Sequence, residues 1–215
     1  MSDSDLGIVV LISGNGSNLQ AIIDQLHLSP APVCIKAVIS NQENAYGLVR
    51  AKNAGIPTHI VKHQRFPDRE QFDREITAII DSYQPQLVVL AGFMRILSGN
   101  FVQHYHDRLI NIHPSLLPEF RGLKTHSRVL QAGVREHGAS VHFVTEDLDS
   151  GPVVLQAHIN VRPDDSEESL AQRVLELEHI IYPLVILWYA QARLRFEQGK
   201  LFFDNKVVTQ ALEEK

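Results

Sequence analysis

The sequence predicts an α/β fold of the Rossmann-like kind: an open, mostly parallel sheet with helices on both faces, followed by a long C-terminal helix and a hairpin. Continuous Val/Ile/Leu runs, typical of strands buried on both faces, alternate with stretches of helical apolar spacing. The first of these runs ends in a glycine-rich turn that opens a helix. A chain of 215 residues is long enough for one well-buried domain and short for two, so we expect a single domain over residues 1–215.

Five strands and the helices between them are expected in the first half of the chain. The opening run LGIVVLI is apolar throughout, and after the glycine-rich turn the apolar residues from Leu19 to Leu26 recur at helical spacing. Gly55 and Pro85 are typical helix stops. The strands expected here are 6–12, 33–40, 58–61, 87–91 and 108–112, and the later helices are 45–54, 68–83 and 98–104.

The second half is expected to add two strands, a long helix and a terminal hairpin. Ser166 is a helix cap, and we expect the helix that it starts to bend where Pro183 removes a hydrogen bond. Gly199 separates the two strands of the hairpin, and the last residues, 211–215, are expected to fray. The predicted ranges are a helix at 125–136, strands at 139–145 and 153–161 around a turn at 147–152, a helix from 166 to about 192, and hairpin strands at 194–196 and 201–203.

Composition and charge narrow the classes of partner. The formal net charge is −5 with a pI near 6.1, and without a basic run this argues against nucleic acid. No apolar run approaches the roughly 18 to 20 residues of a membrane span, so no membrane partner is expected. The acidic start runs directly into a strand, which predicts neither a secretory signal nor a transit peptide, and hence a cytoplasmic protein. Cys34, the single cysteine, is expected to be a packed thiol.

The stretch LINIHPSLLPEFRG carries the strongest sign of chemistry. Side chains two apart on a strand share a face, so Asn111 and His113 point the same way from the end of the strand at 108–112. Pro114 and Pro118 then enforce an irregular loop, beyond the strand ends where open parallel sheets bind ligands. An amide donor and a proton-carrying imidazole suit a developing oxyanion. The alternative is that both side chains only bond the turn that ends the strand.

The glycine-rich turn, Gly14-Asn15-Gly16-Ser17-Asn18, is expected to hold an anion, because free N–H groups and a helix dipole meet there. A dinucleotide fingerprint would have glycine at the position of Leu19 and an acidic residue after the second strand. Since both are missing, a single phosphate is favoured over a nicotinamide cofactor. The alternative is a glycine turn without a ligand.

Asp149 lies in the turn between the two later strands, where its carboxylate could favour an imidazolium at His113. The local sequence favours an ordinary turn residue, since Asp is common in turns, and spacing leaves both readings open. A zinc site built on His104, His106 and His113 is disfavoured, because residues two apart on a helix diverge and no cysteine or carboxylate ligand set accompanies them. We therefore expect no metal.

The chain resembles the glycinamide ribonucleotide formyltransferase family, the folate-dependent enzymes of purine synthesis. The resemblance runs through nearly the whole sequence, in VVLISGNGSNLQAII, VVLAGFMRIL, INIHPSLLP, GASVHFVTEDLDSGPV and EHIIYPLV. The Asn-x-His pair with SLLP and the later Asp are shared with a wider group, which includes methionyl-tRNA formyltransferase, formyltetrahydrofolate deformylase and 10-formyltetrahydrofolate dehydrogenase. The opening GNGSN is specific to the glycinamide ribonucleotide branch.

This resemblance implies a role for each matching residue. Asn111, His113 and Asp149 would be the catalytic trio, and no metal would take part. Arg69 would reach the distal end of the folate. Leu175 departs from the family, which often has a polar residue just before Glu178, so a hydrogen bond to the ribose hydroxyls is lost there. The ribonucleotide would be bound by Gly16, Ser17, Asn18 and Glu178, and the pterin by Met94, Arg95, Ile96, Leu97, Asn111, Thr145, Glu146, Asp147, Leu148 and Asp149.

The implied reaction is direct attack by the amine of 5-phosphoribosylglycinamide on the formyl carbon of 10-formyltetrahydrofolate, without a covalent formyl-enzyme. Asn111 and a protonated His113 would meet the oxyanion, and a water near Asp149 would relay the amine proton. We expect these two small molecules to be the partners, and a monomer or weak homodimer. The rival readings are a deformylase, a transfer-RNA formyltransferase and a ligand-binding sensor on the same scaffold.

Overall fold

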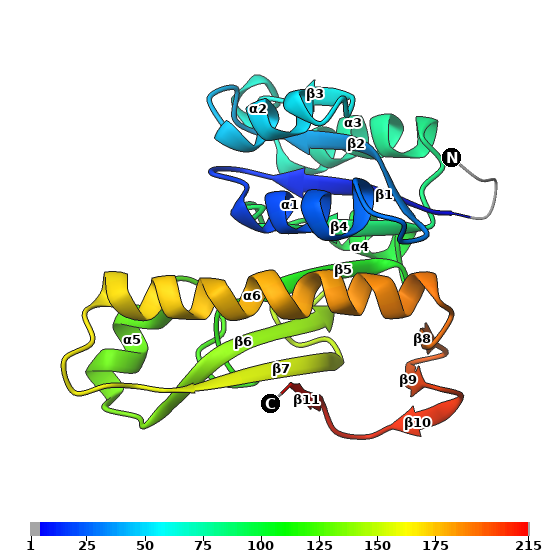
Figure 1. Ribbon diagram of the computed structural model, residues 1–215. Coiled ribbons are helices and arrows are strands. Elements are labelled where there is room, and N and C mark those ends of the chain that lie inside the picture. The colour runs from blue at the N-terminus through cyan, green and yellow to red at the C-terminus, as the bar shows by residue number, and fades with distance from the viewer. Residues whose placement is uncertain (1–4, 215) are drawn as a thin grey trace.

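The computed structural model of this chain describes residues 5–214, and an eight-stranded sheet forms its centre (Figure 1). The strands of this sheet are β1 (Leu6–Ile12), β2 (Val33–Ser40), β3 (Thr58–Ile60), β4 (Leu87–Leu90), β5 (Leu109–His113), β6 (Glu136–Phe143), β7 (Val153–Asn160) and β11 (Leu212–Glu214). Their order is β11-β7-β6-β5-β4-β1-β2-β3. Neighbours from β3 to β5 pair in parallel, whereas β6 is antiparallel to both β5 and β7. The expected open, mostly parallel sheet is confirmed.

Helices cover both faces of the sheet, as predicted. They are α1 (Ser17–Ile22), α2 (Tyr46–Asn53), α3 (Arg69–Ser82), α4 (Gly99–His104), α5 (Thr125–Ala132) and α6 (Glu167–Ala190), with a π turn at Ile23–His27 and a 3-10 turn at His63–Arg65. Alternate residues of β1 supply the two cores: Ile8 and Val10 face α1, α2, α5 and α6, while Val9 and Leu11 face α3 and α4. Figure 1 shows α1 and α6 side by side on the first of these faces.

The long helix α6 begins at a capping box, in which the side chains of Ser166 and Ser169 each accept from the other's main-chain N–H. Pro183 lies inside α6, which continues past it to Ala190. One residue earlier, the buried Tyr182 hydroxyl donates to the carbonyls of Leu90 and Ile110. The expected bend stays a prediction, but the Tyr182 contacts fix α6 on the sheet at the end of β4 and beside β5.

Two expectations about the elements are wrong, and two others are confirmed with a difference in detail. The helix expected at 125–136 ends at Ala132, because Gly133 takes a left-handed conformation and Glu136 already starts β6. The helix expected from the apolar spacing up to Leu26 is confirmed, and it consists of α1 followed by the π turn from Ile23. The predicted C-terminal hairpin is confirmed in β8 (Leu194–Glu197) and β9 (Lys200–Phe203), and β10 (Lys206–Val208) extends it to a three-stranded sheet.

The last error concerns the C-terminal residues, which were expected to fray. Residues Leu212–Glu214 instead form the edge strand β11, parallel to β7, and Lys215 lies outside the described residues. Cys34 is buried in β2 as predicted. Among the helices of residues 5–214, none is long and apolar enough to cross a membrane.

Candidate active site

Asn111 and His113 end the central strand β5, and both face the same side of the sheet. The antiparallel pairing of β5 with β6 places His142 directly opposite Asn111, and the Asn111 Nδ2 atom lies 3.1 Å from His142 Nε2. His113 is buried, and its Nε2–H donates to the carbonyl of Phe120 at 3.1 Å. The sheet thus brings an amide and two imidazoles together at one edge.

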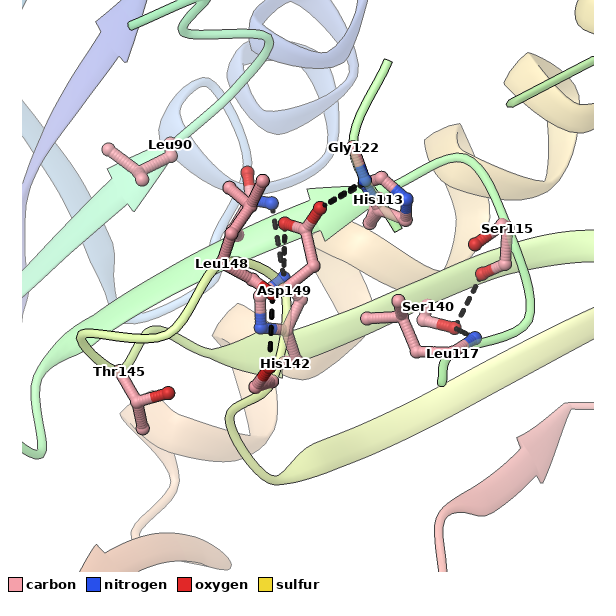
Figure 2. Close-up of polar contacts among 12 residues, drawn as sticks. Leu90, His113, Ser115, Leu117, Gly122, Ser140, His142, Thr145, Leu148 and Asp149 are labelled. Carbon is pink, nitrogen blue, oxygen red and sulfur yellow. Dashed lines mark hydrogen bonds and ion pairs between the residues drawn. The ribbon is translucent and has the colours of Figure 1, made fainter. Parts of the chain in front are cut away.

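The Asp149 carboxylate lies between the two imidazoles (Figure 2). Its Oδ2 atom is 3.5 Å from Nδ1 of His113, and its Oδ1 atom is 3.8 Å from Nε2 of His142. The main-chain N–H of Gly122 donates to the same Oδ2 at 2.8 Å. Asp149 has a positive φ of 49°, a conformation that is uncommon and costs energy for a residue with a side chain. The turn therefore holds this carboxylate close to His113. Spacing in the sequence left it open whether the two residues meet.

His142 is the member of this cluster that the sequence reasoning missed. Its Nδ1 atom lies 2.9 Å from the carbonyl oxygen of Phe143, so this nitrogen donates and Nε2 accepts from the Asn111 amide. Burial lowers the pKa of His142 to about 4, against the opposing influence of the Phe143 carbonyl and the Asp149 carboxylate. A neutral imidazole thus fixes the orientation of Asn111. The position of His142 opposite Asn111 follows only from the register of the β5–β6 pair, which the local sequence does not show.

A cavity of about 600 Å³ opens beside the trio. Exposed apolar side chains surround it, among them Met94, Ile96 and Leu148. The other predicted residues on its wall are Arg69, Arg95, Asn111, His113 and Asp149. A smaller adjoining space of about 110 Å³ is lined by Leu97, Thr145 and Glu146, together with His142. Asp147 is exposed and lines neither space among the described residues, so it is the one predicted folate contact that the structure does not place at these cavities.

The glycine-rich turn packs against α2. Gly16 has a φ of +72°, and a Cβ atom there would lie 2.6 Å from the Cα atom of Gly47, so no larger residue fits. The guanidinium of Arg50 donates to both the main-chain and side-chain oxygens of Asn15 at 3.0 Å. Ser17 opens α1 directly after Gly16. Because β1 and β4 are neighbours, this turn lies at the same edge of the sheet as the trio.

Asn18 and Glu178 are brought together from opposite ends of the chain. The Asn18 amide donates to Glu178 Oε2 at 2.6 Å, while the Asn18 Oδ1 atom is buried and has no hydrogen-bond partner among residues 5–214. Burial raises the pKa of Glu178 to about 7, although the Asn18 hydrogen bond lowers it. Leu175, one helical turn before Glu178, is half-buried. The buried Asn18 oxygen and the Glu178 carboxyl, whose raised pKa disfavours its charged form, lie beside the glycine turn. Both features suit the binding of a polar ligand there.

The histidines considered for zinc are engaged elsewhere. His104 contacts the Asp81 carboxylate at 2.9 Å, and His106 contacts Asp107 at 2.8 Å. Within residues 5–214 no group of three or more His, Cys, Asp and Glu side chains is arranged to hold a metal ion.

Comparisons with known proteins agree with one another. Residues 6–186 match the Formyl transferase family. The phosphoribosylglycinamide formyltransferase of Escherichia coli strain K12 is 54% identical over 201 residues, which cover 94% of this chain and 95% of that protein. A solved phosphoribosylglycinamide formyltransferase from Coxiella burnetii is 53% identical with a TM-score of 0.91, covering 97% of this chain and 99% of that one. The human trifunctional purine biosynthetic protein adenosine-3 is 43% identical over 195 residues, 90% of this chain and 19% of that protein.

Proposed function

The chain belongs to the formyl transferase family, and on that premise we propose that Asn111, His113 and Asp149 carry out its catalysis. The reaction is that of a phosphoribosylglycinamide formyltransferase: the formyl group of 10-formyltetrahydrofolate passes to the amine of 5-phosphoribosylglycinamide in purine biosynthesis. The observation that carries the catalytic assignment is the Asp149 carboxylate, held 3.5 Å from His113 at the wall of the large cavity.

The amine attacks the formyl carbon, a C–N bond forms, and the formyl oxygen takes the negative charge. Asn111 has two amide N–H groups, of which one is directed at His142, so the other is available for this oxyanion. His113 supplies the second donor, and Asp149 stabilises its cationic form by Coulomb attraction. Collapse of the intermediate breaks the bond from carbon to N10, and a water beside Asp149 relays the amine proton to N10.

The His113 side chain must change its partner during this cycle. Its Nε2–H is directed at the Phe120 carbonyl, in the loop between Pro114 and Gly122. For Nε2–H to reach the oxyanion, that hydrogen bond has to break, whereas the Asp149 contact at Nδ1 is retained. Movement of the Phe120 carbonyl is therefore part of the proposed mechanism.

The substrates are assigned to two regions beside the catalytic trio, namely the glycine-rich turn and the large cavity. The glycine turn binds the ribonucleotide phosphate through Gly16, Ser17 and Asn18, and Glu178 also contacts the ribonucleotide, which its hydrogen bond from Asn18 supports. The cavity takes the pterin, which its apolar rim and polar floor suit. Arg69 binds the distal end of the folate. The residues proposed for the folate are the exposed Asp147 and the cavity-lining Arg69, Met94, Arg95, Ile96, Leu97, Asn111, Thr145, Glu146, Leu148 and Asp149.

We further propose that residues 1–215 form one formyltransferase domain and act in the cytoplasm as a monomer or weak homodimer. A single cysteine suits a reducing compartment. The net charge of −5 disfavours nucleic acid, and neither nucleic acid nor a membrane is proposed as a partner.

Acceptor specificity tests this function. The purified chain and 10-formyltetrahydrofolate are mixed with 5-phosphoribosylglycinamide, with methionyl-tRNA, or with water as the only acceptor, and release of tetrahydrofolate is followed. Turnover with the ribonucleotide alone is the expected result. Preferred transfer to water or to tRNA would make the chain a deformylase or a tRNA formyltransferase.

A further inference from the structure

The segment 94–97 borders the large cavity yet has little packing of its own. Met94 and Ile96 are 65% and 61% exposed, and Arg95 is exposed as well. No regular element spans these residues, which lie between β4 and α4. A segment of this kind keeps a fixed shape only when other groups hold its main chain. The shape matters, because the proposed pterin contacts come from this segment.

Asp73 holds the C-terminal end of the segment. Its Oδ2 atom accepts a hydrogen bond of 2.6 Å from the main-chain N–H of Ser98, the residue directly after Leu97. Ser98 is itself the N-cap of α4, where its hydroxyl oxygen accepts from the N–H of Phe101. Asp73 therefore joins the middle of α3 to the start of α4, across 25 residues of sequence.

Burial of the Asp73 carboxylate costs free energy, so we expect this side chain to have a specific role. Asp73 is 2% exposed, and its second oxygen, Oδ1, has no hydrogen-bond partner in the described part of the chain. Burial raises the pKa of Asp73, while the hydrogen bonds from Ser98 and the charges of Arg69 and Arg95 lower it. Both arginines line the large cavity. The same side chain thus acts on the main chain of the segment and on its cationic neighbours.

Ser13 holds the other end. The main-chain N–H of Met94 donates to the Ser13 hydroxyl oxygen at 2.7 Å. The Ser13 hydroxyl donates in turn to Asn41 Oδ1 at 2.6 Å, and the Ser13 main-chain N–H donates to Gly92 at 3.1 Å. Ser13 directly precedes the glycine-rich turn, so one residue touches both substrate regions.

We propose that Asp73 and Ser13 are positioning residues for the folate: they fix the two ends of segment 94–97 in the shape that binds the pterin. This inference rests on the proposed function, which assigns the segment to the folate. The two residues differ in one respect. Asp73 contacts the folate side alone, whereas Ser13 also adjoins the turn that binds the ribonucleotide phosphate. Their substitutions should therefore change different Michaelis constants.

The role of Asp73 is tested with the variants Asp73→Ala and Asp73→Asn, and Glu75→Ala is the control. Loss of a charge-assisted hydrogen bond should raise KM for 10-formyltetrahydrofolate about tenfold or more in Asp73→Ala. The KM for 5-phosphoribosylglycinamide should stay within about twofold, since that site keeps its contacts. Asp73→Asn retains an oxygen that can accept from Ser98 and should recover most of the folate affinity. Glu75 is exposed on the same helix, and its removal should change neither constant.

Ser13→Ala should raise both Michaelis constants, and Ser13→Thr, which keeps the hydroxyl, should restore them. An unchanged folate KM in folded Asp73→Ala, or an equal rise in both constants there, would overturn the inference. If Asp73→Ala does not fold, Asp73→Asn decides: its weaker, uncharged hydrogen bond to Ser98 should raise the folate KM about two- to threefold and leave the ribonucleotide KM unchanged, and a folate KM that does not rise, or an equal rise in both constants, would overturn the inference. Failure of the proposed function looks different, because the wild-type chain would then show no transfer to the ribonucleotide.

Discussion

Asn111 and His142 face each other across the antiparallel β5–β6 pair, with the Asn111 amide nitrogen 3.1 Å from Nε2 of His142. The far side of the imidazole is fixed by the main chain, since Nδ1 lies 2.9 Å from the Phe143 carbonyl oxygen. Asn111 therefore has its orientation set before any ligand arrives. Stabilisation of a short-lived negative charge depends on donors that are already in place.

His142→Ala should lower kcat about tenfold or more, because the Asn111 amide loses the partner that orients it. Both Michaelis constants should change little. His142→Gln keeps an acceptor oxygen on a side chain of similar reach, and its kcat should lie closer to that of the wild type. Steady-state kinetics with both substrates check this. Equal kcat values for His142→Ala and the wild type would remove His142 from the mechanism.

His113→Ala should lower turnover by about 10² to 10⁴, the scale associated with a proton-handling or oxyanion-binding group. His104→Ala provides the control, because His104 contacts Asp81 and the Tyr105 ring and is not among the residues that line the large cavity in the described part of the chain. Wild-type turnover in His113→Ala would show that this imidazole does not act on the reacting atoms.

Glu178 should make folding stability depend on pH. Its folded pKa of about 7 lies above the ordinary 4.5, so between these values the unfolded chain has lost a proton that the folded chain keeps. Stability from this group is complete below pH 4.5 and is lost as the pH rises through 7, by about 3 kcal/mol at most. Glu178→Gln should remove this decline.

Urea unfolding at pH 5 and pH 8 measures the effect. The free energy of unfolding of Glu178→Gln, relative to the wild type, should rise between the two pH values. Glu176→Gln, at an exposed position on the same helix, should show no such rise. Parallel pH profiles for all three proteins would mean that the pKa of Glu178 in the folded protein is close to that of an ordinary carboxyl group.

Gly16→Ala should lower the free energy of unfolding by about 2 kcal/mol, because the position combines a positive φ with a close contact to Gly47. The ribonucleotide KM should rise as well, since the glycine turn has to shift. Gly14→Ala is the matched control for stability: the space around that position is open and its φ is not positive. Thermal unfolding of the two variants compares them, and equal Tm values would contradict the packing argument.

Local patterns were sufficient to predict one part of the site and most of the sheet. The run at β1 and the alternation of Asn111 with His113 depend only on residues close in sequence, so the strand and the shared face of the pair followed from spacing. The end of α5 also has a local signal in the sequence, because Gly133 is a typical helix stop.

The contacts that the sequence did not predict join residues that are far apart in the chain. His142 reaches Asn111 only through the β5–β6 register, and Asp149 reaches His113 only because its turn folds back with a positive φ. The strand β11 contains two glutamates, which have low strand propensity, and forms only because β7 offers it an edge. The contact between Asp73 and Ser98 joins two helices and leaves no local pattern.

The decisive measurement is the steady-state kinetics of Asp149→Asn, a substitution that keeps the shape of the side chain and removes its charge. With the carboxylate no longer facing His113, kcat should fall by about 10² to 10⁴, while both Michaelis constants stay within about threefold. A kcat equal to that of the wild type would contradict the role assigned to the Asp149–His113 pair.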